Sequence, residues 1–376
     1  MINDKCFTID WLESFKRQRE HKLIQANILE KMIYALHLLE QLKNNGLEFV
    51  FKGGTSLVLL LEEGNRFSID IDIVCNTERK ELEAILNKVI ESSKFTSVTL
   101  NERRSYKPGV PKAHYSFAFE SVFNTKTTGS ILLDVLVEEP IYPELVKSNI
   151  HAKWIETDSI VKVKTPSIDA ITGDKLTAFA PNTIGIPYFK GDEPFTLEIC
   201  KQLFDLSRLF ERISNIEVVS NSFKAHAEQE IKYRKKADDK IKLIPEDVLQ
   251  DTIDTCLIIT KRDANSEEPA KTNYKLLLDG IKAFGTGYLM SGNFRIDDAV
   301  IAASRVAYLA VKLLVNDLSP INYYKGEDIK LLTIEDPAWN VLNKLKKQPD
   351  KSLFYYWYQT VQLLASRKSN GIKGKS

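Results

Sequence analysis

Residues 51–75 read FKGGTSLVLLLEEGNRFSIDIDIVC, and this stretch decides both the fold and the chemistry that we expect. Its last part, residues 68–75, alternates between apolar and other side chains, which is typical of a strand with one buried face. Asp70 and Asp72 then share the other face, with Cα atoms about 6–7 Å apart. Two acids this close repel each other unless a cation lies between them, and Mg²⁺ prefers oxygen ligands of this kind.

The four residues Gly53, Gly54, Thr55 and Ser56 lie between an expected strand at 47–52 and an expected short helix at 55–63. Glycine lets the backbone approach a phosphate closely. The N–H groups at a helix start bind such an anion, and a hydroxyl can add to them. The sequence therefore places a predicted phosphate site shortly before a predicted metal site.

A third acid, Asp134, lies among apolar residues in ILLDVLVEE, which predicts a central strand. If that strand pairs beside residues 68–75, Asp134 points to the same metal ions and helps to deprotonate an incoming hydroxyl. A pair of such ions holds the attacking and leaving oxygens of a phosphoryl displacement. Taken singly, the acid pair also fits a solvated strand face, the glycines a plain turn, and Asp134 an edge charge.

The order of predicted elements indicates an α+β protein with two domains. Helices are expected at 24–45, 78–94, 166–180 and 195–213, and further strands at 96–101, 114–119 and 131–137. This order implies a mixed sheet covered by helices in residues 1–215, with a loop at 181–194. The strand pattern fades afterwards, and residues 216–376 read as an α-helical bundle.

Composition excludes several classes of protein. The 376 residues have a net charge of +1, so any site for a polyanion must be local. The four cysteines show no spacing typical of zinc or a disulfide framework. The N-terminus lacks the apolar core of a signal peptide, and no apolar run is long enough to span a bilayer. We therefore expect a cytoplasmic protein with no membrane partner.

The motifs at residues 52–57 and 66–72 resemble the nucleotidyltransferase superfamily and, more narrowly, the AbiEii/AbiGii toxin family. The resemblance is carried by Lys-Gly-Gly-Thr-Ser-Leu, which begins at Lys52, and by Arg-Phe-Ser-Ile-Asp-Ile-Asp, which begins at Arg66. It implies a nucleotidyltransferase-fold domain, a nucleoside triphosphate (NTP) substrate and Mg²⁺. It also implies a role in abortive infection or a type IV toxin–antitoxin system, with a cognate antitoxin as a partner. We expect Lys52, Arg66 and the glycine turn to bind the nucleotide.

The resemblance extends to two later segments and covers about residues 45–210. Asp-Lys-Leu-Thr-Ala at 174–178 is similar to a family motif whose lysine, here Lys175, grips the triphosphate. Lys-Gln-Leu-Phe-Asp-Leu at 201–206 is similar to a motif in which Asp205 acts as a further catalytic acid or base. Two features depart from the pattern. The family usually has an arginine between these motifs, where this chain has Lys190 in a longer loop, and Gln202 stands where the family often has an acid.

The expected reaction moves a nucleoside monophosphate from an NTP to an acceptor hydroxyl. The resemblance suggests the 3′ end of a tRNA as that acceptor. A basic segment at 232–240, KYRKKADDK, fits contacts with RNA phosphates, but a solvated helix face interleaved with acids is the interpretation that we favour from the sequence. Three alternatives stay open. They are a small-molecule or protein acceptor, a non-catalytic interaction module that keeps the fold, and a toxin held inactive by a partner protein.

Overall fold

The computed structural model describes residues 1–17, 25–61, 66–106, 110–123 and 128–373. Backbone contacts group the chain into two compact units. We call Met1–Ser167 with Tyr288–Gly292 the sheet unit, and Ile168–Gly287 with Asn293–Ser376 the helical unit. The boundary expected at residue 215 falls inside the helical unit, so a domain division there remains a prediction.

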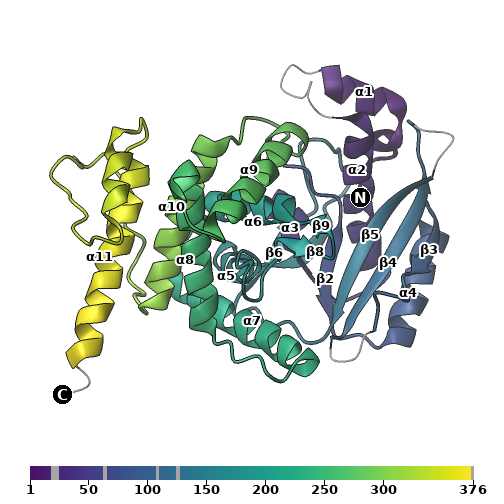
Figure 1. The fold of residues 1–376 in the computed structure, drawn as a ribbon. Helices are drawn as coiled ribbons and strands as arrows, with labels where there is room; N and C mark the ends of the chain where they lie inside the picture. The colour runs from purple at the N-terminus through teal and green to yellow at the C-terminus, as the bar shows by residue number, and fades with distance from the viewer. Residues whose placement is uncertain (18–24, 62–65, 107–109, 124–127, 374–376) are drawn as a thin grey trace. The chain divides into compact units, whose positions relative to one another are not determined.

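The sheet unit is built on a seven-stranded mixed sheet with the strand order β3-β4-β5-β2-β1-β7-β6. Figure 1 labels the first four of these, with β4 and β5 between β3 and β2. Two pairs, β2 with β5 and β1 with β7, are parallel, and the other neighbours are antiparallel. The strands are β1 (Val50–Lys52), β2 (Ile71–Cys75), β3 (Phe95–Leu100), β4 (Lys112–Glu120), β5 (Thr128–Val137), β6 (Leu145–Asn149) and β7 (Lys162–Pro166).

Among the described residues of this unit, the helices are α1 (Ile9–Arg17), α2 (Ala26–Asn44), α3 (Gly53–Leu60) and α4 (Arg79–Ser92), with a 3₁₀ turn η1 at Asp4–Phe7. Helix α2 is buried over most of its length and contributes a run of leucines to the core. On the other side of that core lie the inward residues of β2, β4 and β5, such as Ile71, Phe117 and Leu133. The mixed sheet covered by helices that we predicted is confirmed.

The helical unit consists of helices around α10, which packs against α6, α8 and α11. Buried alanines on α10, among them Ala303 and Ala307, let its neighbours approach closely. The helices are α5 (Ile168–Ala178), α6 (Thr196–Phe210), α7 (Ile216–Ala237), α8 (Pro245–Lys261), α9 (Ala270–Gly287), α10 (Ile296–Leu314) and α11 (Ser352–Lys373). They are accompanied by the 3₁₀ turns η3 (Arg262–Ala264) and η4 (Asn340–Lys347) and by a small hairpin of β8 (Phe189–Lys190) and β9 (Glu193–Pro194).

Most predicted elements occur within a few residues of their expected bounds. The helix expected at 55–63 is α3, which begins two residues earlier, at Gly53, and whose last expected residues lie outside the described part. The strands β6 and β7 and the helix α1 were not predicted, and the expected loop at 181–194 contains the short hairpin of β8 and β9. Only the described helices were searched for membrane spans, and none of them is both long and apolar enough to cross a bilayer.

Candidate functional site

A row of four ionisable side chains crosses the middle of the sheet. His114 on β4 is the cross-strand partner of Asp134 on β5, Asp134 is the partner of Asp72 on β2, and Asp72 is the partner of Lys52 on β1. Cross-strand partners lie on the same face, and adjacent strands are about 4.8 Å apart. The register thus places the two carboxylates next to each other, with a basic residue at each end of the row.

The environment of these acids differs from that of their strand neighbours. Ile71 and Ile73, which flank Asp72, are fully buried in the core, whereas Asp72 is partly exposed. Asp134 has 35% of its side chain exposed. Asp70 lies just before β2 and is exposed. The alternation predicted for this stretch therefore separates a core face from a solvent-accessible acidic face.

The glycine turn reaches directly to Asp72. Gly53 has φ of +75°, a conformation that residues with a Cβ rarely adopt. A Cβ built on Gly53 would lie 2.1 Å from Oδ2 of Asp72, so the carboxylate rests against the glycine backbone. The start of α3 and the carboxylate of the second predicted metal ligand are therefore immediate neighbours.

The side-chain hydroxyls of this turn form hydrogen bonds within the protein. Thr55 and Ser56 are buried. Thr55 Oγ1 donates to the backbone carbonyl of Asp70 at 2.6 Å and bonds with Ser68 Oγ at 2.7 Å, and Ser56 Oγ donates to the carbonyl of Gly53. These bonds fix the α3 turn against the segment that carries Asp70. The groups suited to an anion here are the backbone N–H groups of the first turn of α3, because the Lys52 side chain at the N-cap has no acceptor for them.

Arg66 lies against the same turn. A Cβ on Gly54 would come within 2.2 Å of Arg66 Nη2, and Arg66 as a whole is only 8% exposed. Arg66 Nη1 donates to the carbonyl of Phe67 at 3.1 Å. The segment is held by Tyr288–Gly292, since Phe67 N–H donates to the Tyr288 carbonyl and Arg66 forms a β-bridge with Leu289.

Lys175 and Asp205 meet within the helical unit. Lys175 Nζ on α5 lies 2.7 Å from Asp205 Oδ2 on α6, and the two side chains are 6% and 2% exposed. Lys175 also donates to Oε1 of Gln202 at 3.0 Å, so the glutamine that departs from the family pattern joins this pair. The two motifs that lie apart in the sequence are thus brought together as a buried ion pair.

A divalent ion fits the acid pair of the sheet unit when a nucleotide is present. No group of three or more His, Cys, Asp or Glu side chains within metal-binding range occurs among the described residues. Mg²⁺ sites in enzymes that use NTPs commonly take one or two carboxylates, and phosphate oxygens and water complete the shell. Asp72 and Asp134 provide such a two-carboxylate set, and the roles predicted for them and for Asp70 remain predictions.

His114 is the site residue that sequence reasoning missed. Its Nδ1 lies 2.6 Å from Oδ1 of Asp134, and 15% of its side chain is exposed. His114 and Asp134 each belong to an alternating strand pattern. Such a pattern does not determine which residues of β4 lie opposite which residues of β5. The contact therefore could not be read from the chain alone.

Comparisons with known proteins add a family. A family model described as "Nucleotidyl transferase AbiEii toxin, Type IV TA system" matches residues 37–287. The chain is similar to the structure of MenT4, a nucleotidyltransferase toxin from Mycobacterium tuberculosis H37Rv, with 14% identity, a TM-score of 0.46 and coverage of 82% of this chain and 90% of that one. It is also similar to JHP933 from Helicobacter pylori, with 19% identity, a TM-score of 0.34 and coverage of 68% and 91%.

The family match includes the glycine turn, the acidic strand β2, Asp134 on β5 and the pair formed by Lys175 and Asp205. It covers more than half of the chain and agrees with the resemblance seen in the motifs at residues 52–57 and 66–72. The chain belongs to the AbiEii nucleotidyltransferase toxin family, and it is a nucleotidyltransferase.

Proposed function

We propose that this nucleotidyltransferase moves a nucleoside monophosphate from an NTP to a hydroxyl of an RNA and releases pyrophosphate. Asp72 and Asp134 hold Mg²⁺ together with phosphate oxygens of the NTP, and Asp70 approaches the ion as a further ligand once the nucleotide is bound. The observation that carries the proposal is the pairing of Asp72 with Asp134 in register, together with the Asp72 carboxylate lying against Gly53. This arrangement joins two carboxylates to a helix start that suits a phosphate. Phosphoryl transfer needs these two elements side by side.

The residues of the sheet unit have separate tasks in this proposal. The first N–H groups of α3 hold the triphosphate, and Asp134 accepts the proton of the attacking hydroxyl. Arg66 and Lys52 offset negative charge on the nucleotide. When bound, Mg²⁺ neutralises the charge that develops on the phosphate oxygens. For Lys175 and Asp205 we propose contacts with the triphosphate and a proton-transfer role, on the basis of the family motifs alone.

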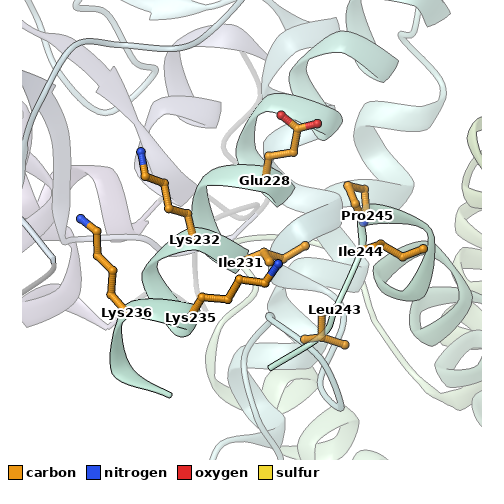
Figure 2. Close-up of a pocket in the computed structure, with 8 residues that line it drawn as sticks. All are labelled: Glu228, Ile231, Lys232, Lys235, Lys236, Leu243, Ile244 and Pro245. Atoms are coloured by element: carbon orange, nitrogen blue, oxygen red, sulfur yellow. The ribbon is translucent and has the colours of Figure 1, made fainter. Parts of the chain in front are cut away.

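The proposal for an RNA acceptor draws on a basic groove in the helical unit. This groove, of about 550 Å³, has three exposed lysines, Lys232, Lys235 and Lys236, and one acid, Glu228 (Figure 2). Its apolar lining residues are Ile231, Leu243, Ile244 and Pro245.

The lysines occupy the C-terminal end of α7. In Figure 2, Lys232 and Lys236 extend to one side of this helix and Lys235 to the other. Residues 224–242 contain seven Lys and Arg against four Asp and Glu, whereas the whole chain is almost balanced at 52 against 51. Lysines that follow a helix in this way suit phosphates of a nucleic acid, and the aliphatic lining offers no ring for stacking on bases. We therefore propose contacts with an RNA backbone here. A tRNA 3′ end as the acceptor is proposed on the family resemblance alone.

The central experiment incubates the protein with each labelled NTP in turn, Mg²⁺ and total RNA. Asp72→Asn is compared with Asp10→Asn, because Asp10 is an exposed acid on α1 of the same unit. We expect labelled RNA from the unmodified protein and from Asp10→Asn, and a loss of at least about 100-fold for Asp72→Asn. Label on the protein or on a small molecule would favour the alternative acceptors, and no transfer from any NTP would favour a non-catalytic module.

The groove is tested by charge reversal. Changing the three groove lysines to Glu is compared with the same change at Lys271, Lys275 and Lys282, three exposed lysines of α9. We expect only the groove variant to lose RNA labelling. The slope of log affinity against log salt should also fall by roughly one for each phosphate that the variant no longer binds. Full labelling by the groove variant would exclude this surface from acceptor binding.

We further propose that the protein acts in the cytoplasm as a growth-arresting toxin with a cognate antitoxin. Support comes from the family, whose description includes type IV toxin–antitoxin systems. Induced expression of the unmodified protein should halt growth, and expression of Asp72→Asn should not. Equal arrest by both would separate the toxicity from nucleotidyl transfer.

A further inference from the structure

The contact between His114 and Asp134 has the geometry of a strong, charge-assisted hydrogen bond. The distance from His114 Nδ1 to Asp134 Oδ1 is 2.6 Å. A carboxylate can only accept, so the ring nitrogen is the donor, and the bond uses one of the two carboxylate oxygens. The other oxygen, Oδ2, stays available for a ligand.

The backbone on both sides of this bond is fixed. Strands β4 and β5 pair without interruption from Lys112 to Glu120, with His114 opposite Asp134. The backbone N–H of His114 donates to Ser105 Oγ at 2.9 Å, and that hydroxyl donates in turn to the carbonyl of Asn101. Since Ser105 is buried, the ring projects from a strand position that has little freedom to shift.

The row explains why a donor is needed at this position. Carboxylates directly opposite each other on neighbouring strands are unfavourable, and Asp134 faces Asp72 in this way. Lys52 is the other cross-strand partner of Asp72, and His114 is the other partner of Asp134. A donor on the outer side of Asp134 holds that carboxylate in one rotamer despite the repulsion from Asp72.

We propose that His114 is a positioning residue of the transfer reaction. It holds Oδ1 of Asp134, and thereby presents Oδ2 to the Mg²⁺–NTP complex and to the acceptor hydroxyl beside Asp72. This inference rests on the proposed function, because it requires Asp134 to bind the metal. Outer hydrogen bonds of this kind usually change metal affinity by about 10–100-fold.

The test measures metal binding separately from turnover. Mn²⁺ binding in the presence of an α,β-methylene NTP analogue is followed by electron paramagnetic resonance, and kcat, KM for NTP and the half-saturating Mg²⁺ concentration are measured in parallel. We compare His114→Ala with His114→Asn, because the Asn amide places a donor close to the position of Nδ1. His151→Ala serves as the control, since His151 is an exposed histidine of the same unit outside the row.

We expect His114→Ala to bind Mn²⁺ at least about 10-fold more weakly and to need correspondingly more Mg²⁺. KM for NTP at saturating Mg²⁺ should be unchanged, and His114→Asn should recover most of the affinity. Thermal unfolding identifies the variants that are folded. If His114→Ala does not fold, His114→Gln takes its place, because its amide reaches the position of Nε2 and leaves Oδ1 without its donor.

The inference would be overturned if the folded His114→Ala or His114→Gln variant bound Mn²⁺ as tightly as the unmodified protein does. So would equal losses in folded His114→Asn and His114→Ala. The Asp72→Asn variant distinguishes an error in the role of His114 from an error in the proposed function. If Asp72→Asn transfers nucleotide and binds Mn²⁺ normally, the proposed function itself is wrong, whatever the His114 variants do.

Discussion

At the scale of single residues, Gly53 couples the helix start to the acidic strand. Its φ of +75° and the position of Asp72 Oδ2, 2.1 Å from where a Cβ would be, impose two separate demands on this residue. The first concerns the backbone and the second concerns the carboxylate. A second glycine of the same unit, Gly46, has a similar φ of +88°, but a Cβ there would meet no described atom within 4 Å.

The pair of glycines allows a matched test. Gly46→Ala and Gly53→Ala both introduce backbone strain of about 1–2 kcal/mol, measured by urea unfolding. Only Gly53→Ala also displaces the Asp72 carboxylate, and a shift of about 1 Å in a reacting group costs on the order of 100-fold in rate. We therefore expect Gly53→Ala to lose nucleotidyl transfer and Gly46→Ala to keep it. Similar activity in the two variants would contradict a role for the Asp72 position.

The sequence was informative about residues whose role depends on short spacing. Gly53, Gly54, Asp70 and Asp72 are close in the chain, so a turn and an alternating strand were enough to place them. His114 lies 20 residues before Asp134, and their contact depends on a register that no local pattern states. The hydroxyls of Thr55 and Ser56 were expected to be possible phosphate ligands, but their bonds to the backbone are fixed by folding.

At the scale of elements, α5 and α6 are joined by the buried ion pair of Lys175 and Asp205. The two side chains are almost inaccessible to solvent. Removing one partner from such a pair leaves an uncompensated buried charge, whereas replacing both by apolar residues is often neutral for stability. Stability and catalysis can therefore be separated at these positions.

We predict that Lys175→Met lowers the free energy of unfolding by about 3–5 kcal/mol. The double variant Lys175→Met/Asp205→Leu should regain most of that loss, because no buried charge is left without its partner. If the pair also serves transfer, the stable double variant remains inactive in the labelled-NTP assay. Recovery of activity together with stability would assign the pair a purely structural role.

The strands β6 and β7 are the elements of the main sheet that were not predicted from the sequence. Both have five residues, and β7 ends in Pro166. Residues 161–166, VKVKTP, alternate over a length that already favours a half-buried strand, so β7 could have been predicted from this pattern, whereas residues 145–149, LVKSN, do not alternate. The long helix α2 was predictable because apolar residues recur at helical spacing over several turns, and the long helices α9 and α10 fall in the part that was predicted as an α-helical bundle.

At the scale of the whole molecule, the sheet unit is made of two stretches of chain. Tyr288–Gly292, between α9 and α10, belongs to it and not to the helical unit. Met290 is buried in the core of the sheet unit, and Tyr288 accepts the N–H of Phe67. A single boundary divides a chain into two continuous segments, whereas this unit contains two separate stretches of chain. A change in the pattern of apolar residues marks the end of one kind of structure, but it does not show that a later segment packs against an earlier unit.

The packing of Tyr288–Gly292 in the sheet unit gives a prediction for Met290, which lies far from Asp72 and Asp134 in the sequence. Met290→Ala should lower the free energy of unfolding by about 2–5 kcal/mol, as expected for a large-to-small change in a core. Loss of support for residues 66–67 should also reduce transfer. Ser291→Ala, at the exposed neighbouring position, should change stability by less than about 0.5 kcal/mol. Denaturant unfolding gives the free energy of unfolding of both variants, and the labelled-NTP assay gives their transfer activity. If Met290→Ala changed neither quantity, Tyr288–Gly292 would be dispensable for the sheet unit.

The late segment also sets the order in which the protein is completed during translation. A ribosome that has finished all seven strands has not yet made Tyr288, so the amide of Phe67 lacks the carbonyl to which it bonds in the finished fold. That bond forms only after residue 288 of 376 has left the exit tunnel. Growing chains shorter than this therefore carry the segment that leads into the acidic strand without the hydrogen bond that fixes it in the finished sheet unit.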